Sequence, residues 1–409
     1  MSIKISLKLR MSFFVCLAIV MFPVSNLAGG GILGHYDEVL GMIGILVSFA
    51  LLLKGKIEGN NKYICIILLA ITIIGFVSNR FSGLMTQTRP ILIDMLALWK
   101  IYAVYLLFSI ATARAGAERV IEGLQLIAKA TILFVTFVSL LRFVVDIGVN
   151  IVYISTSETK FGFFWQNAIQ TGWLLFGCLI IIAASKKNST KLFIKYLTIA
   201  TIAMLQTESA LVLCWLFSSI ALMVLIKENK KFKVRYMLLL TAGVVAFSIT
   251  DIMLYSDYEA VRMKFLRYAV VTAKTYFPFG SGFATYGTDM AAKYYSQLYT
   301  KYGWENTWAL GKDSIYLNDT FFAGIIGQFG WIGMALYVIL LINLFRNFNT
   351  VRYDKTVRAL LLATVITIGV VMIGSASAKS MMGAYMFAVL GVANACKKPQ
   401  PDAVRKQTE

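Results

Sequence analysis

Arg262 has the clearest chemical requirement of any side chain in this sequence. A helix is predicted over residues 257–276, and at about 100° per residue it would place Arg262 in the middle of an apolar face. That face is formed by Phe265, Leu266, Ala269 and Ala273. A guanidinium on an apolar face needs an anionic partner, because burying it alone is costly. Glu259, one turn earlier, could be that partner, so the pattern predicts either an anion-binding arginine or a structural ion pair.

Two carboxylates, Asp319 and Glu208, stand next to apolar runs. A carboxylate at either position could accept a proton from a hydroxyl group. Asp319 stands two positions before the run that begins at Phe321, where an aspartate equally well caps the following helix. Glu208 lies in the very short turn QTES, between two apolar runs.

The stretch 277–287 reads FPFGSGFATYG and is followed by many aromatic residues. Gly280 and Gly282 allow a tight turn or a close approach of the backbone to a ligand. A phosphate-binding loop is not indicated, because no GxxxxGK[ST] motif or strand accompanies the glycines. The aromatic residues suit a membrane-interface belt or stacking against sugar rings. They are Tyr286, Tyr294, Tyr295, Tyr299, Tyr302, Trp304 and Trp308.

Membrane helices must position these residues. The chain has 409 residues, of which 59% are hydrophobic and only 14% charged, and its mean hydropathy is +0.74. Apolar runs of about 15–25 residues recur along it, near the length that spans a bilayer, and a spanning segment is a helix because it satisfies its own backbone. The sequence predicts an all-α polytopic protein with about twelve spans. These are 11–27, 39–53, 63–77, 92–112, 126–147, 168–184, 192–205, 211–226, 237–252, 321–344, 359–373 and 381–395.

The basic residues indicate how the chain crosses the membrane. The net charge is +19, and most lysines and arginines lie in alternate short loops, as the positive-inside pattern requires. This placement predicts cytoplasmic termini, and it assigns the charge to topology rather than to nucleic-acid binding. The chain is then one membrane domain, 1–409, with a smaller outer loop at 148–164, a large outer loop at 253–318 and a cytoplasmic tail at 396–409. Unpaired cysteines and a single histidine predict neither disulfides nor a metal site.

The ordered series Arg262, FPFGSGFATYG, KYYSQLYTKYG and NDTFFAGIIGQFGWIG resembles the signature loop of the Wzy-type O-antigen and exopolysaccharide polymerases, within the O-antigen ligase/polymerase family. The resemblance is close over residues 261–333 and covers the twelve-span layout overall. It implies a GT-C-like helical bundle in the bacterial inner membrane, with the large outer loop between helices 9 and 10. The implied reaction is metal-independent glycosyl transfer without a cofactor. A glycan chain would move from undecaprenyl pyrophosphate to the non-reducing end of an incoming lipid-linked repeat unit.

The resemblance also implies roles for residues. Arg262 falls where the family has its large-loop arginine and would bind the diphosphate, with Lys160 and Arg267 assisting. Asp319 stands where the ligases have histidine, which favours a polymerase, and it or Glu208 would be the catalytic carboxylate. Further substrate contacts would come from Gln166, Asn167, Gly280, Gly282, Tyr294, Tyr295 and Trp304.

Two other functions remain open. A ligase would share the fold and the donor but transfer the chain to lipid A core. A transporter or flippase of lipid-linked sugars would need polar groups at mid-membrane, often in repeated halves, and the sequence shows neither. The partners implied by the resemblance are the lipid-linked oligosaccharide and membrane lipid, with a chain-length regulator and a flippase of the same pathway as candidate partner proteins.

Overall fold

The structure is a computed structural model that describes residues 2–57, 59–152, 159–165, 167–227, 230, 232–233, 236, 242–243, 261–307, 309–312, 314 and 316–397. Its longer helices are α1 (Ser2–Ala28), α2 (Tyr36–Leu53), α3 (Gly59–Ser82), α4 (Thr88–Ala115), α5 (Ala117–Leu141), α6 (Ala168–Ala184), α7 (Thr190–Gln206), α8 (Ala210–Leu225), α10 (Val261–Thr275), α13 (Phe321–Phe348), α14 (Lys355–Gly374) and α15 (Met381–Ala395). Short elements are α11 (Asp289–Lys293), α12 (Gln297–Lys301), the 3₁₀ helices η1 (Gly31–His35), η2 (Phe163–Trp165), η3 (Trp304–Asn306) and η4 (Ser377–Lys379), and the strands β1 (Asn150–Val152) and β2 (Thr159–Phe161).

The prediction of an all-α membrane protein is confirmed. Among the described residues, seven helices are long and apolar enough to cross a membrane, and α6, α8 and α15 are shorter apolar helices. Helices also cover the other predicted spans, except that the ninth, 237–252, lies almost wholly outside the described residues. The number of twelve spans therefore stays a prediction.

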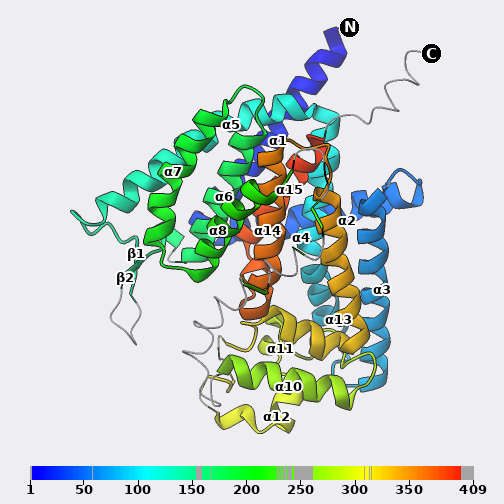
Figure 1. Cartoon of the computed structure of the whole chain (residues 1–409). Coiled ribbons are helices and arrows are strands. Elements are labelled where there is room, and N and C mark those ends of the chain that lie inside the picture. Colours follow the sequence, from blue (N-terminus) through cyan, green and yellow to red (C-terminus); the bar gives the residue numbers. More distant parts are fainter. Residues whose placement is uncertain are drawn as a thin grey trace.

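The helices form a bundle, and different helices lie at its two ends. Figure 1 shows α1 beginning and α15 ending at one end, whereas α10, α11 and α12 form a layer at the opposite end. α15 packs against α4 and α6 and is buried along almost its whole length, because the helix is apolar all round. The described part of the predicted outer loop 253–318 is thus an ordered helical layer on the bundle.

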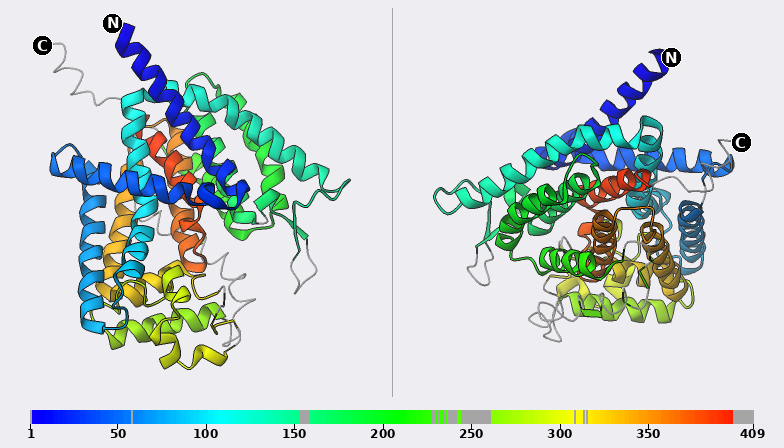
Figure 2. Two further views of the ribbon diagram at one scale, coloured as in Figure 1. Left: turned by 180° about the vertical axis from the view of Figure 1, so that it is seen from behind. Right: turned by 45° about the horizontal axis from the view of Figure 1, so that its top comes forward.

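α2 is held against α4 by a buried ion pair. Figure 2 shows α2 running across α3 and α4 rather than alongside them. A Cβ added to Gly44 would lie 2.4 Å from the carbonyl oxygen of Ala103, so only glycine permits this crossing. The Lys100 ammonium donates to Asp37 Oδ2 at 2.6 Å, and the two side chains are only 14% and 5% exposed. Removing one partner of such a pair typically costs about 3–5 kcal/mol, so Lys100 stabilises the packing of α2 on α4.

α13 is broken at Gly330, although the sequence predicts one unbroken span over 321–344. Gly330 has φ 62° and ψ −160°, a backbone conformation that glycine adopts without steric cost. The break releases helical carbonyl groups, and the stretch 277–287 satisfies them. Ser281 N–H donates to the Gly327 carbonyl at 3.0 Å, and Gly282 N–H donates to the Gln328 carbonyl at 2.8 Å. The break therefore anchors the layer of α10, α11 and α12, called the outer layer below, to the bundle.

The segment 148–164, predicted as the smaller outer loop, contains a ribbon that the sequence does not predict. α5 ends at Leu141, before the predicted end at residue 147, and β1 and β2 then pair antiparallel with Ile151 opposite Lys160. Strands of three residues are too short for an alternating pattern to reveal them.

Candidate functional site

The glycines of the stretch 277–287 face protein. Gly280 and Gly282 have φ values of 77° and 96°. A Cβ at Gly280 would lie 2.4 Å from the nitrogen of Gly330, and a Cβ at Gly282 would lie 2.6 Å from the nitrogen of Asn79. Asn79 also bonds both backbone groups of Phe283, at 2.8 and 2.9 Å. The close approach that the glycines allow is thus made to α3 and α13, which gives both glycines a structural role, and the substrate contact at them stays a prediction.

The outer layer has a small aromatic core of its own. Trp304 is 1% exposed and stacks on Tyr299 with a centroid distance of 5.3 Å. Tyr286 and Phe265 complete the cluster at a centroid distance of 4.8 Å. Trp304 is therefore not available to line an open glycan groove, because its ring lies inside the layer. The buried side of α10 agrees with the prediction, since Phe265, Ala269 and Ala273 are all buried.

Two of the predicted aromatic contacts remain accessible. Tyr294 is 39% exposed, and Tyr295 is partly buried, with its hydroxyl donating to the Leu310 carbonyl at 3.2 Å. The Lys312 ammonium lies 5.8 Å from the centre of the Tyr295 ring. The apolar C–H face of a sugar ring could stack on Tyr294 without any rearrangement of the aromatic core.

Arg262 and Asp319 form an ion pair at the surface of the layer. Arg262 Nε donates to Asp319 Oδ2 at 2.7 Å, and the side chains are 50% and 26% exposed. Two predictions are corrected here. Arg262 is not buried on the apolar face of its helix, and Asp319 does not cap α13, whose N-cap is Thr320. The predicted alternative partner, Glu259, lies outside the described residues.

A second carboxylate, Asp289, is linked to the neighbour of Asp319 by a hydrogen bond. Asn318, the neighbour of Asp319, donates through Nδ2 to Asp289 Oδ1 in the first turn of α11. α11 begins at this point because the Thr288 hydroxyl accepts the Ala291 N–H at 3.3 Å, which is a helix N-cap.

Lys379 places a second cation beside these acids. It lies in η4, and its ammonium is 4.8 Å from the centre of the Phe321 ring, two residues beyond Asp319. Among the described residues, none forms a hydrogen bond or ion pair with the Lys379 ammonium. Burial lowers the pKa of Lys379, whereas the charges of Asp289 and Asp94 raise it. Because burial disfavours the charged form of Lys379, an anion beside it would stabilise the ammonium.

Asp94 anchors the inner side of the same region. Its Oδ2 accepts the Ala284 N–H at 2.7 Å and the Gln328 side-chain amide at 2.5 Å. A cavity of about 10 Å³, close to the smallest space that holds one water, lies among Asp94, Gln328 and Lys379. This cavity is too small to hold a substrate larger than a water molecule.

We refer to Arg262, Asp319, Asn318, Asp289, Lys379, Asp94 and Gln328 as the polar strip. The sequence identified both residues of its outer pair, Arg262 and Asp319, but it did not indicate Lys379 as a site residue. One signal was present, because Lys379 is the only basic residue between α14 and α15, in a turn that the charge pattern assigns to the outer side. α10 adds Lys264, Arg267 and Lys274 to Arg262 and carries no acidic residue. Arg267 is exposed.

The remaining predicted residues belong to a second group beside the ribbon. Arg142 donates to Asn150 of β1 at 3.4 Å, and burial lowers the pKa of Arg142 while the charge of Glu208 raises it. Lys160 lies in β2. Figures 1 and 2 place this ribbon away from α10, so Glu208 and Lys160 are not brought together with Arg262 and Asp319.

Asn167 and Gln166 complete the predicted set. Asn167 caps α6, because its side-chain oxygen accepts the N–H groups of Ile169 and Gln170 at 3.0 and 3.4 Å. This cap accounts for Asn167 without a substrate. Gln166 lies outside the described residues.

A scan of protein-family models and a search of curated proteins found no match to this chain.

Proposed function

We propose that the chain is a polysaccharide repeat-unit polymerase, a metal-independent glycosyltransferase of the bacterial inner membrane that uses a lipid diphosphate-linked sugar donor. The observation that best supports the proposal is the exposed Arg262–Asp319 pair, with the Lys379 ammonium nearby, at the end of the bundle opposite the start of α1. The pair combines a diphosphate-binding group with a carboxylate that can accept a proton. Its position also fits the motif resemblance over residues 261–333.

In the proposed reaction, the acceptor hydroxyl attacks the anomeric carbon of the donor glycan. The new carbon–oxygen bond forms as the bond to the diphosphate breaks, and undecaprenyl pyrophosphate leaves with the bonding electron pair. The Arg262 guanidinium stabilises the developing charge through two parallel hydrogen bonds, and the Lys379 ammonium adds a second positive charge. Asp319 accepts the proton of the attacking hydroxyl.

The ion pair gives this reaction an order of events. A diphosphate competes with Asp319 for Arg262, because both present oxygen acceptors to the same guanidinium. When the donor binds, Asp319 loses its partner and becomes free to accept a proton. Arg262 is half exposed and Asp319 about a quarter exposed, so little free energy opposes the exchange, because pairs near the surface are typically worth about 0–1 kcal/mol.

Deletion of the gene tests the proposed reaction. In the mutant, surface core should carry a single repeat unit, because ligation continues while polymerisation fails. The measurement is a gel of surface polysaccharide, with the gene restored on a plasmid as the control. A ligase mutant would instead show bare core, with long chains left on the lipid carrier. Unchanged long chains on the surface would exclude both functions.

The proposal requires α10–α12 to lie outside the cytoplasm and both termini to lie inside it. In a variant without the five native cysteines, a cysteine at the exposed position 312 should react with a membrane-impermeant thiol reagent when the outer membrane is permeabilised. A cysteine at position 230 should react only after lysis, since Lys230 lies in a basic loop on the opposite side. Protection of position 312 would contradict the topology.

A further inference from the structure

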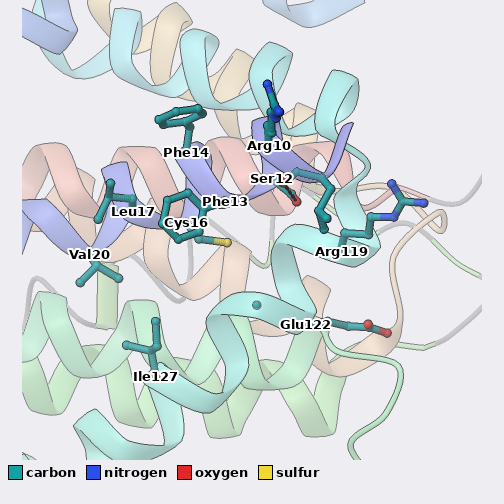
Figure 3. Close-up of a pocket in the computed structure, with 12 residues that line it drawn as sticks. Arg10, Ser12, Phe13, Phe14, Cys16, Leu17, Val20, Arg119, Glu122 and Ile127 are labelled. Atoms are coloured by element: carbon teal, nitrogen blue, oxygen red, sulfur yellow. Dashed lines mark hydrogen bonds between the residues drawn. The ribbon is translucent and has the colours of Figure 1, made fainter. Parts of the chain in front are cut away.

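α1 and α5 enclose a groove with largely apolar walls. The groove has a volume of about 1100 Å³, which is larger than most ligand pockets, and it is lined by Phe13, Leu17, Val20 and Ile127. Figure 3 shows these apolar side chains toward one end of the groove. The charged residues Arg10, Arg119 and Glu122 lie toward the opposite end. Cys16 and Gly123 also line it, and a Cβ at Gly123 would lie 3.0 Å from Cys16 Sγ, so the two helices touch here and the groove has a floor of protein.

The charged end of the groove is positive. Arg10 and Arg119 line it, and neither makes an ion pair or hydrogen bond with any residue in the described part of the chain. The one acidic residue there, Glu122, is already paired, because its Oε2 lies 3.0 Å from the Lys187 ammonium. Two uncompensated guanidinium groups therefore stand at the end of an apolar channel.

We propose that this groove binds one anionic diacyl phospholipid, with the lipid phosphate at Arg10 and Arg119 and an acyl chain along Phe13, Leu17 and Val20. A channel between helices in a bilayer is filled by lipid tails, and a guanidinium binds phosphate oxygens in a paired geometry. Two arginines favour an anionic over a zwitterionic headgroup, which carries its own cation beside the phosphate. The site is separate from the polar strip and does not depend on the proposed reaction.

Native mass spectrometry of the purified full-length protein tests the site. With phosphatidylglycerol and phosphatidylcholine of the same chain length, we expect one lipid to be retained and phosphatidylglycerol to bind about tenfold or more tightly. The double variant Arg10→Gln/Arg119→Gln should reduce this preference to about twofold or less. Arg114→Gln is the matched control, because Arg114 is exposed in the last turn of α4 and does not line the groove.

A second measurement uses the unaltered protein. Phosphatidylglycerol with a photoreactive group in one acyl chain should label peptides that contain Leu17, Val20 or Ile127, and Leu17→Trp, which fills the groove, should reduce that labelling at least about fivefold. Equal retention of the two lipids, an unchanged preference in the double variant, or labelling spread evenly over the helices would overturn the proposal. A dimer that forms through α1 and α5 and excludes lipid would also overturn it.

Discussion

Arg262→Ala should lower polysaccharide polymerisation by about 10²–10³-fold, while the protein still accumulates in the membrane. The expected loss is that of a preorganised charge aimed at a leaving group, which is typically of this size. Accumulation should persist because Arg262 is half exposed and Asp319 about a quarter exposed, and ion pairs near the surface typically contribute only about 0–1 kcal/mol to stability. Surface chain length, measured on a gel beside the level of membrane protein, separates the two effects.

Arg262→Lys should also lose most of the activity, although it keeps the charge. The guanidinium is a planar fork whose donors match two phosphate oxygens, whereas an ammonium is a compact and strongly hydrated point charge. A loss of about tenfold or more in this variant would indicate bidentate binding rather than simple charge attraction. Arg267→Ala should lose less than Arg262→Ala, because Arg267 lies farther along α10, away from Asp319.

The charge-reversed variant Arg262→Asp/Asp319→Arg distinguishes catalysis from structure. If the pair only fixes α10 to the start of α13, the exchanged pair should restore both accumulation and long chains. If Arg262 binds diphosphate, the exchanged protein should accumulate and remain inactive. Lys274→Ala is the matched control, since Lys274 is exposed at the far end of the same helix. Normal long chains from well-expressed Arg262→Ala would remove Arg262 from the site.

The sequence predicts the helices well because each must bury or present a long apolar surface. The runs 168–184 and 381–395 have the same bounds as α6 and α15. The apolar face of α10 is also predicted, since Phe265, Ala269 and Ala273 recur at helical spacing. In these elements the residues that the local apolar pattern marks for burial are also the ones that the tertiary structure buries.

The site is less predictable because its contacts join distant segments. Arg262 and Asp319 are 57 positions apart, and no local pattern pairs them. Lys379 lies in the turn before α15, next to Phe321 at the start of α13, and a single charge is the only sequence signal there. Glycine is ambiguous in a different way. Gly324, Gly327, Gly330 and Gly333 recur every three residues, as in closely packed membrane helices, and that spacing hides the break at Gly330.

Gly330→Ala should therefore be among the most damaging single changes in the protein. At φ 62° and ψ −160° an alanine is strained, and its Cβ would lie 2.3 Å from the Pro278 carbonyl oxygen and 2.6 Å from the Gly280 nitrogen. Relief requires either displacing the stretch 277–287 or straightening α13. We expect a loss of about 4 kcal/mol or more, seen as low accumulation and a lowered melting temperature of the purified protein.

The two forms of relief can be told apart, and the result bears on the polar strip. A straightened α13 would reclaim the carbonyl groups of Gly327 and Gln328, which now accept the N–H groups of Ser281 and Gly282. The displaced stretch should then become sensitive to protease, and chain length should fall even in the protein that survives. Gly369→Ala is the control, because Gly369 lies within α14 with no atom within 4 Å of an added Cβ, and alanine favours a helix by up to about 1 kcal/mol. If Gly330→Ala accumulates as well as Gly369→Ala and makes normal long chains, the break does not hold the outer layer in its working position.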